Sequence, residues 1–100
     1  IKSSKLKIFN NFNFISINIL SKKQKLISDN FAKTTPDWNN IDYKLLKNGN
    51  PIIKNCISNL DCRIMNKIKK GDHIIFICKV LKVMNNDKLK PLIYYNSKYI

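Results

Sequence analysis

Acidic and arginine side chains are scarce in this chain of 100 residues. Glutamate is absent, and Arg63 is the only arginine beside 18 lysines, so the formal net charge is +13. The lysines are scattered, and a single arginine provides few of the bidentate hydrogen bonds that recognise bases and phosphates. We therefore expect no specific nucleic-acid binding, only a weak and salt-sensitive affinity for polyanions. A phosphate-bearing cofactor would be attracted to the same surface.

The composition tempers this reading of the charge. Lysine, isoleucine and asparagine occur 18, 17 and 15 times and so make up half of the chain. All three have A/T-rich codons, so part of the basic balance reflects codon usage rather than a partner. A chain of this length is one domain at most, with a modest core.

Long apolar runs are also missing. No run is long enough to cross a bilayer, so we expect no membrane segment. The basic start Ile1–Lys5 is followed by strand-like sequence without a cleavage-site pattern, so we predict no signal peptide. The first residue is Ile rather than Met, which indicates a fragment or a reading frame cut from a longer one.

The three cysteines, Cys56, Cys62 and Cys78, form no Cys-x-x-Cys pair, and no histidine stands at metal spacing from them. We therefore expect no metal site. An odd cysteine count without a framework indicates a reducing compartment, and hence a cytoplasmic protein, with the cysteines used as small core residues.

The stretch Gly71–Val83 organises the chain. It opens with the turn signal Lys70-Gly71-Asp72 and runs into unbroken apolar sequence, which predicts a strand buried on both faces. His73, the only histidine, stands at the start of this strand. It could reach a ligand from a rigid backbone, or simply form a hydrogen bond at a strand start.

A strand followed directly by a helix is predicted near the N-terminus. Phe12–Leu20 alternates β-branched and polar residues, and Ser21 begins a capping box with Gln24, so Lys22–Lys33 is expected to be helical. A helix N-terminus offers free N–H groups to an anionic or carbonyl-bearing ligand, and the Asn18 amide can donate and accept hydrogen bonds. The alternative is a capped helix without a ligand.

The remaining segments predict further strands. Thr34–Pro51 is expected to be a loop whose Trp38 and Tyr43 stack on a ligand or plug an apolar patch. After it we expect a strand with Cys56, Leu60, Cys62, Ile64 and Ile68 on one face, and a third strand from Lys90 to Tyr95 after the Asn85–Asp87 turn. The three consecutive strands would form an antiparallel meander.

Several of these segments resemble the flavin reductase-like family of FMN-binding split barrels. Gly71-Asp72-His73 followed by an apolar strand resembles the C-terminal part of the family, as does the tail Pro91–Tyr99. Phe14–Gln24, with Phe31-Ala32 after it, is similar to the family's Phe-x-x-Asn-Val-Leu-Ser-x-x-Gln…Phe-Ala segment. The resemblance implies a mainly β fold with one short helix, part of an antiparallel, Greek-key-like split β-barrel whose N-terminal strands are missing.

The resemblance also implies an activity and a site. Residues 1–100 would be a single partial domain of an NAD(P)H-dependent flavin reductase that supplies reduced FMN, or FAD, to a partner monooxygenase. His73 would position the nicotinamide or flavin as the catalytic residue. The flavin contacts implied are Asn18, Ile19, Leu20, Ser21, Gln24, Phe31, Tyr95 and Tyr99. Tyr95 and Tyr99 would close the pocket near His73.

The implied partners are NADH or NADPH, a second copy in a homodimer, and a monooxygenase component or a complementary N-terminal fragment. Two alternatives stay open. One is a flavin-binding or degenerate fragment without catalysis, because the family's additional N-terminal strands have no match here. The other is a small basic nucleic-acid-binding domain, which only the charge favours.

Overall fold

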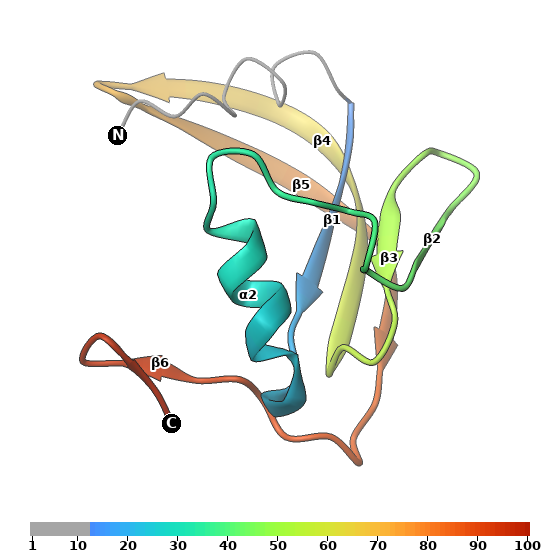
Figure 1. Cartoon of the computed structure of the whole chain (residues 1–100). Coiled ribbons are helices and arrows are strands. Elements are labelled where there is room, and N and C mark those ends of the chain that lie inside the picture. Colours follow the sequence, from blue (N-terminus) through green and yellow to red (C-terminus); the bar gives the residue numbers. More distant parts are fainter. Residues whose placement is uncertain (1–12) are drawn as a thin grey trace.

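The computed structural model describes residues 13–100, which form mostly β structure with one short helix (Figure 1). In chain order the elements are β1 Phe14–Ile19, the 3₁₀ helix η1 Lys22–Gln24, α2 Lys25–Phe31, β2 Tyr43–Leu45, β3 Pro51–Ile53, β4 Ser58–Lys70, β5 His73–Asn85, β6 Tyr94–Tyr95 and β7 Lys98–Tyr99. The expected mainly β fold with one short helix is confirmed. Within residues 13–100, no helix has the length and apolar character needed to span a membrane.

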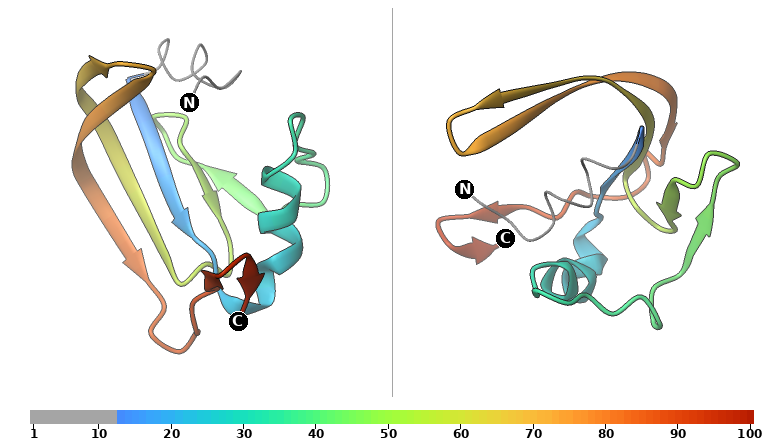
Figure 2. Two further views of the ribbon diagram at one scale, coloured as in Figure 1. Left: turned by 90° about the vertical axis from the view of Figure 1, so that its left-hand side faces the viewer. Right: turned by 90° about the horizontal axis from the view of Figure 1, so that it is seen from above.

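The main sheet is antiparallel and has the strand order β1-β4-β5. The central strand β4 pairs with β1 along one edge, where Ile17 lies opposite Leu60, and with β5 along the other, where Leu60 lies opposite Val83. The long β4–β5 hairpin curls away from the rest of the sheet, while α2 lies beside the sheet (Figures 1 and 2). Among the described residues this arrangement leaves β5 at an edge of the sheet.

The expectation that Gly71–Val83 is buried on both faces is wrong. Among residues 13–100, no strand pairs with the outer edge of β5, and the Ile75 and Ile77 side chains are about half exposed. Its apolar run is genuine, but burial depends on which elements pack against a strand, and the sequence of the strand alone does not specify them. Gly71 adopts a φ of 60°, which lets the chain turn tightly from β4 into β5.

The predicted strand after Pro51 is broken into two. β3 ends at Ile53, Asn55 takes a φ of 65°, and Cys56 therefore lies in the turn before β4 instead of on its face. The register in which β4 pairs with β5 also shifts between Ile64 and Asn66. An extra residue in a strand reverses the alternation of side chains, so Ile68 does not share the face of Ile64, contrary to expectation.

Two small hairpins replace parts of the expected layout. β2 forms inside the expected loop 34–51 and pairs with β3. The segment Lys90–Tyr95 adds no third strand to a meander, because Asn96 and Ser97 have φ values of 52° and 62° and fold β6 back onto β7. The helix is confirmed, but its first turn is 3₁₀ and α2 ends at Phe31 rather than Lys33.

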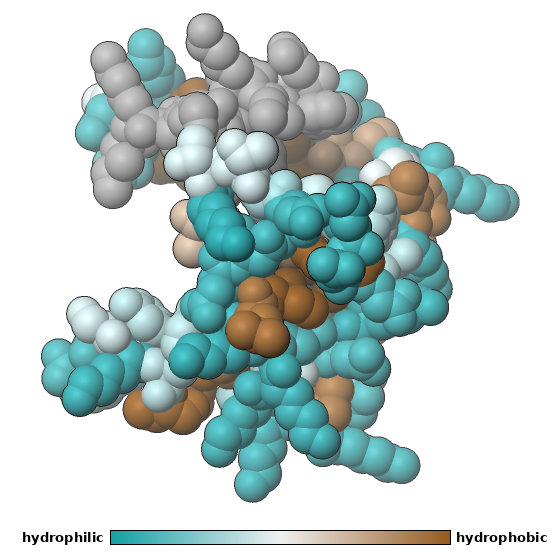
Figure 3. Space-filling view, viewed as in Figure 1, coloured by the Kyte–Doolittle hydropathy of each residue, from teal (hydrophilic) through white to brown (hydrophobic). Residues whose placement is uncertain are grey.

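The core of the described residues is small and half polar. Its buried apolar residues are Ile52, Ile53, Cys56 and Cys62, and its buried polar residues are Ser21, Gln24, Asn50, Asn59 and Asp61. Hydrophilic residues dominate the face that carries α2, with apolar residues gathered in a patch beside the helix (Figure 3). Because buried polar groups must be hydrogen-bonded, this core depends on a network of specific contacts.

Candidate functional site

The junction between β1 and the helix is held by a C-terminal strap, Lys90–Leu92. The Lys22 N–H donates to the Lys90 carbonyl at 2.8 Å, and the Leu92 N–H donates to the Leu20 carbonyl at 3.1 Å. Between these bonds, Ser21 and Pro91 form an isolated β-bridge. The strap therefore fixes the backbone of the junction from one side.

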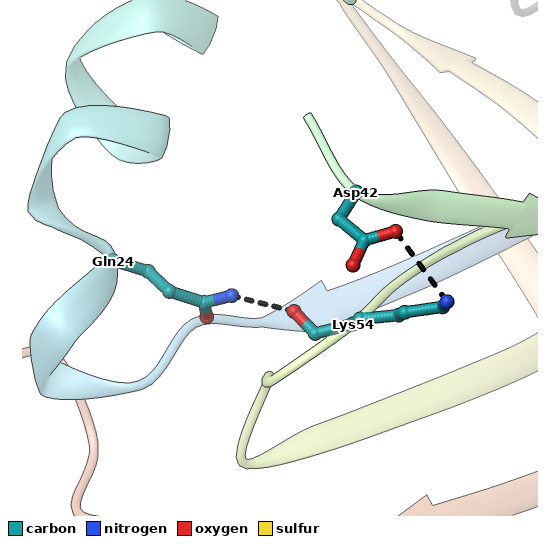
Figure 4. Close-up of polar contacts among 3 residues, drawn as sticks. All are labelled: Gln24, Asp42 and Lys54. Atoms are coloured by element: carbon teal, nitrogen blue, oxygen red, sulfur yellow. Dashed lines mark hydrogen bonds and ion pairs between the residues drawn. The ribbon is translucent and has the colours of Figure 1, made fainter. Parts of the chain in front are cut away.

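Gln24 fixes the same junction from within the helix, as the capping box predicted. Its Oε1 accepts a hydrogen bond from the Ser21 N–H at 2.9 Å, and its Nε2 donates to the Lys54 carbonyl at 2.7 Å (Figure 4). Both ends of the buried amide are thus used inside the protein. The side chain of Gln24 positions the junction against the end of β3.

Asn18 joins three strands through its side chain. Its Oδ1 accepts from the Ile53 N–H at 3.1 Å and from Asn59 Nδ2 at 2.6 Å, and its Nδ2 donates to the Pro51 carbonyl at 3.2 Å. Ser16 Oγ donates to the same carbonyl at 2.6 Å. These contacts join β1 to β3 and β4, so both the oxygen and the nitrogen of the Asn18 amide are hydrogen-bonded within the protein.

A pocket of about 380 Å³ lies beside the junction. Its lining combines the helix start with residues from the β2–β3 region, namely Ser21, Lys23, Gln24, Ile27, Asn40, Asp42, Lys54, Asn55 and Leu89. Lys54 Nζ lies 3.4 Å from an Asp42 carboxylate oxygen, with both side chains more than half exposed (Figure 4). An exposed ion pair of this kind holds its partners weakly, so Lys54 can turn to an anionic ligand.

The residues that line this pocket from 40–55 were not predicted from the sequence. Lys54 follows β3 and Asn40 lies in the preceding loop, and neither belongs to a recognisable motif. They reach the junction only because β2 and β3 fold back onto β1. No local signal in the sequence could have identified them.

Cys56 and Cys62 are buried near this network. Burial raises the pKa of the Cys56 thiol, although hydrogen bonds with Asn59 and Gln24 oppose the shift. Burial also raises the pKa of Cys62, with Cys78 and Asp61 adding to the effect. The folded protein therefore favours both thiols in the protonated form, consistent with their expected use as core residues. No disulfide joins the three cysteines.

We expect the free energy of unfolding to fall as the pH rises from 7 to 10. A raised pKa in the folded state means that unfolding releases protons above the usual thiol pKa of about 8.5, so alkaline pH favours the unfolded chain. Urea unfolding at the two pH values would measure this change. Cys56→Ala and Cys62→Ala together should remove most of the thiol contribution. An unchanged pH dependence in the double variant would contradict this origin.

A second cavity, of about 900 Å³, lies between α2 and the β6–β7 hairpin. Tyr99 reaches across it: its hydroxyl lies 2.8 Å from Ser28 Oγ and donates to Asp29 Oδ1 at 3.1 Å. Lys25 Nζ lies 5.3 Å from the centre of the Tyr99 ring, within cation–π range. Tyr99 thus anchors the C-terminal hairpin to the helix.

Phe31 and Tyr95 lie outside both pockets. Phe31 packs edge-on against Trp38 with ring centres 4.9 Å apart, and Trp38 packs in the same manner against Tyr43 at 4.8 Å. The sequence left two roles open for Trp38 and Tyr43, stacking on a ligand or filling an apolar patch. Their ring contacts with each other and with Phe31 agree with the second role. The Tyr95 side chain is exposed on β6.

His73 stands at the far end of the sheet from the junction. It pairs with Lys70 at the tip of the β4–β5 hairpin, whereas Ile19 at the end of β1 lies beside Ser58, which pairs with Asn85 at the other end of β5. Figures 1 and 2 show the hairpin tip and β6 at opposite ends of the molecule. The expected closure of Tyr95 and Tyr99 around His73 is therefore not present in residues 13–100. His73 Nδ1 lies 2.7 Å from Asp72 Oδ1.

A buried carboxylate forms a second polar cluster, between β4 and the β2–β3 hairpin. Asp61 Oδ1 accepts hydrogen bonds from Asn48 Nδ2 at 2.9 Å and from Asn50 Nδ2 at 2.6 Å. Among residues 13–100, no group of three or more His, Cys, Asp or Glu side chains lies close enough to hold a metal ion. The cluster fastens the β2–β3 hairpin to the central strand.

Known proteins match the chain over almost its whole length. The family model described as "Flavin reductase like domain" matches residues 2–100. The reductase subunit HsaB of a flavin-dependent monooxygenase from Mycobacterium tuberculosis is 31% identical over 86 residues, covering 83% of this chain and 46% of HsaB. The NADH-dependent FMN reductase RutF of Serratia proteamaculans is 26% identical over 95 residues, covering 92% of this chain and 54% of RutF. The chain thus spans about half the length of these curated relatives.

The fold has close counterparts among solved structures. The flavin reductase PheA2 in its native state superposes with a TM-score of 0.86 at 29% identity, covering 99% of this chain and 63% of PheA2. The arrangement of the described elements is therefore that of a flavin reductase split barrel, although the sheets of residues 13–100 do not close into a barrel.

Proposed function

The chain belongs to the flavin reductase-like domain family, and from this membership we propose that it takes part in the reduction of a flavin by a nicotinamide nucleotide. RutF is named as an NADH-dependent FMN reductase, and HsaB as the reductase subunit of a monooxygenase. By analogy the cofactors are FMN or FAD with NADH or NADPH. The reduced flavin would pass to a monooxygenase component.

The junction pocket is the proposed flavin site, and its rigid walls are the observation that carries this proposal. Asn18 and Gln24 use their amides to hold the backbone from Ile19 to Ser21 in place. Lys23 and Lys54 bring positive charge to the lining. A volume of about 380 Å³ falls in the range of roughly 300–1,000 Å³ that is usual for small-molecule sites.

The lining fits the polar edge and the phosphate of such a cofactor. The Asn40 and Asn55 amides can donate and accept hydrogen bonds, and the two lysines can neutralise a phosphate. When bound, the flavin itself would supply the hydride-accepting ring. The protein has to orient that ring and exclude solvent, and no side chain is required as an acid or base.

The roles of the remaining predicted site residues stay predictions. The family resemblance implies that His73 contacts the nicotinamide and that Tyr99 forms part of the wall of the cavity beside α2. Within one chain His73 lies at the far end of the sheet from the junction pocket, so it would serve a flavin there only from the second copy of the proposed homodimer. The three free thiols support a reducing, cytoplasmic compartment. A homodimer, which the family resemblance implies, also stays a proposal.

A second candidate function is flavin binding without catalysis. It is favoured by the share of the curated relatives that the chain covers, 46% of HsaB and 54% of RutF. If catalysis requires groups from both halves of such a domain, this chain would bind flavin and leave NADH unoxidised. One pair of assays separates the two candidates.

We expect the purified chain to quench FMN fluorescence saturably at micromolar concentrations. Lys54→Ala should weaken FMN binding by about tenfold, because a charged contact to phosphate is worth about 1.5 kcal/mol or more. Lys44→Ala, an exposed lysine on β2 outside the pocket, is the matched control and should have no effect. Flavin-dependent loss of NADH absorbance would establish the first candidate. Quenching without NADH loss would establish the second.

A folded, monodisperse chain that does not quench FMN would contradict both candidates. Equal weakening by Lys54→Ala and Lys44→Ala would contradict the location of the site, because it would indicate only the general attraction of a basic protein for phosphate.

A further inference from the structure

One acidic side chain, Asp42, lines the junction pocket together with two lysines. Among the lining residues that the structure describes, Asp42 is the only acid, and Lys23 and Lys54 are the only basic residues. Two lysines against one aspartate leave this lining with a net formal charge of +1. The Asp42 carboxylate therefore lowers the attraction of the pocket for an anion.

The backbone of Lys54 is fixed on both sides. Its N–H donates to the Asp42 carbonyl at 2.9 Å, and its own carbonyl accepts from Gln24 Nε2 at 2.7 Å. Figure 4 shows Lys54 between these two residues, with its ammonium turned toward the Asp42 carboxylate. The ammonium is thus the movable part of Lys54, and the main-chain hydrogen bond keeps Asp42 beside it.

The Asp42 carboxylate and the phosphate of a ligand would compete for this ammonium. Lys54 Nζ lies 3.4 Å from Asp42 Oδ1, and the two side chains are 55% and 70% exposed. An ion pair this exposed favours the paired arrangement by at most about fivefold. A phosphate can therefore displace Asp42, but it loses that factor and then lies next to an unpaired carboxylate that repels it.

The competition depends on the charge of the ligand and not on its ring. A phosphate monoester such as FMN carries a charge of about −1.5 to −2 at pH 7. Riboflavin has the same ring system and ribityl chain but no phosphate, so it needs no contact with Lys54 and is not repelled by Asp42. The Asp42 carboxylate should therefore weaken the binding of FMN and leave that of riboflavin unaffected.

We propose that Asp42 is a specificity-determining residue that keeps FMN binding weak by competing with the phosphate for Lys54. The inference rests on the flavin site proposed above. Affinity differences of this kind appear mainly in the dissociation rate, so FMN bound in this way leaves the pocket readily. The pocket would thus handle FMN as a substrate that is exchanged, and reduced FMN would be free to reach a monooxygenase component.

FMN and riboflavin titrations of Asp42→Asn test the proposal. The substitution keeps the shape of the side chain, and the variant should fold because the Asp42 hydrogen bond with the Lys54 N–H is made by the main chain. We expect Asp42→Asn to bind FMN about fivefold to tenfold more tightly, with a correspondingly slower dissociation in stopped-flow fluorescence. Its affinity for riboflavin should change by less than about twofold.

Two further variants locate the effect. Asp87→Asn removes a negative charge from the exposed turn after β5, outside the described pocket lining, and should change FMN affinity by less than about twofold. In a chain that already carries Lys54→Ala, Asp42→Asn should strengthen FMN binding by no more than about twofold, because the competition for the ammonium is absent. Asp42 and Lys54 should thus be coupled in FMN binding and independent in riboflavin binding.

The results separate the role of Asp42 from the flavin site on which it rests. An unchanged FMN affinity of Asp42→Asn would overturn the role of Asp42 and leave the flavin site standing. Equal strengthening by Asp42→Asn and Asp87→Asn, or equal effects of Asp42→Asn on FMN and riboflavin, would have the same meaning. A folded chain that quenches neither flavin would contradict both the site and the role of Asp42.

Discussion

Replacing Asn18 by alanine should lower the free energy of unfolding by about 3 kcal/mol, among the largest effects expected of any substitution in this chain. The change removes the acceptor for the Ile53 N–H and for one Asn59 N–H, together with the donor to the Pro51 carbonyl. Ser16 still satisfies that carbonyl, but the Ile53 N–H loses its partner in a partly buried site. Urea unfolding followed by circular dichroism would measure the loss.

Asn85→Ala provides the matched control for Asn18→Ala. Asn85 also accepts a side-chain hydrogen bond, from Ser58 Oγ at 2.7 Å, but in an exposed position where water can replace the lost partner. Its effect should stay within about 0.5 kcal/mol. Similar losses for the two variants would show that the network around Asn18 is not the main fastening between β1 and β3.

The second large effect is expected at Asp61. Asp61→Ala should destabilise the fold by about 3 kcal/mol, because it leaves the Asn48 and Asn50 amides without their charged acceptor. Asn50 keeps a longer contact, 3.3 Å, to the Cys62 carbonyl. The β2–β3 hairpin should loosen first, so amide exchange in Tyr43–Leu45 should accelerate more than in β1.

Asp61→Asn separates the charge from the shape of this side chain. It keeps one acceptor oxygen in place and should cost about half as much as Asp61→Ala. Asp87→Ala, in the exposed turn after β5, is the control for loss of a negative charge from a basic protein. If Asp87→Ala were as harmful as Asp61→Ala, net charge rather than the buried cluster would explain the loss.

The sequence predicted those elements whose signals are local. The capping box at Ser21 and Gln24 correctly marked the start of the helix. The alternation in the predicted strand Phe12–Leu20 correctly indicated β1 at Phe14–Ile19, while Phe12 lies outside the described residues. The turn at Gly71 correctly indicated a hairpin. Each of these features depends on residues within a few positions of one another, so the pattern alone specifies the conformation.

Features that depend on tertiary pairing could not be predicted in this way. The edge position of β5 within residues 13–100 follows from which strands are its neighbours, and the reversal of Ile68 follows from one extra residue between Ile64 and Asn66. The short strand β2 lies in a stretch rich in turn residues, so its sequence gave no strand signal. Propensity is a weak guide wherever the partner strand decides the outcome.

In the candidate site, too, the features with a local sequence signal were predicted and those that depend on tertiary contacts were not. The junction residues Ile19 to Gln24 were identified from a contiguous motif, and the structure holds their backbone in place as a unit. The motif did not reveal that the Asn18 and Gln24 side chains are used for internal fastening. It also gave no indication of Lys54, which only the fold of β3 brings to the pocket.

The strap that holds the junction has a consequence for the order of folding. The bond from Lys22 to Lys90 and the contact between Ser28 and Tyr99 join segments that are far apart in the sequence, the latter across 71 positions. Contacts of such high order close large loops and form late, after local hairpins and helical turns. During synthesis the start of the helix is made early, and its bonds to Lys90 and Tyr99 can form only after those residues have been added. The proposed flavin pocket should thus take shape late in folding, after the local hairpins and helical turns that surround it.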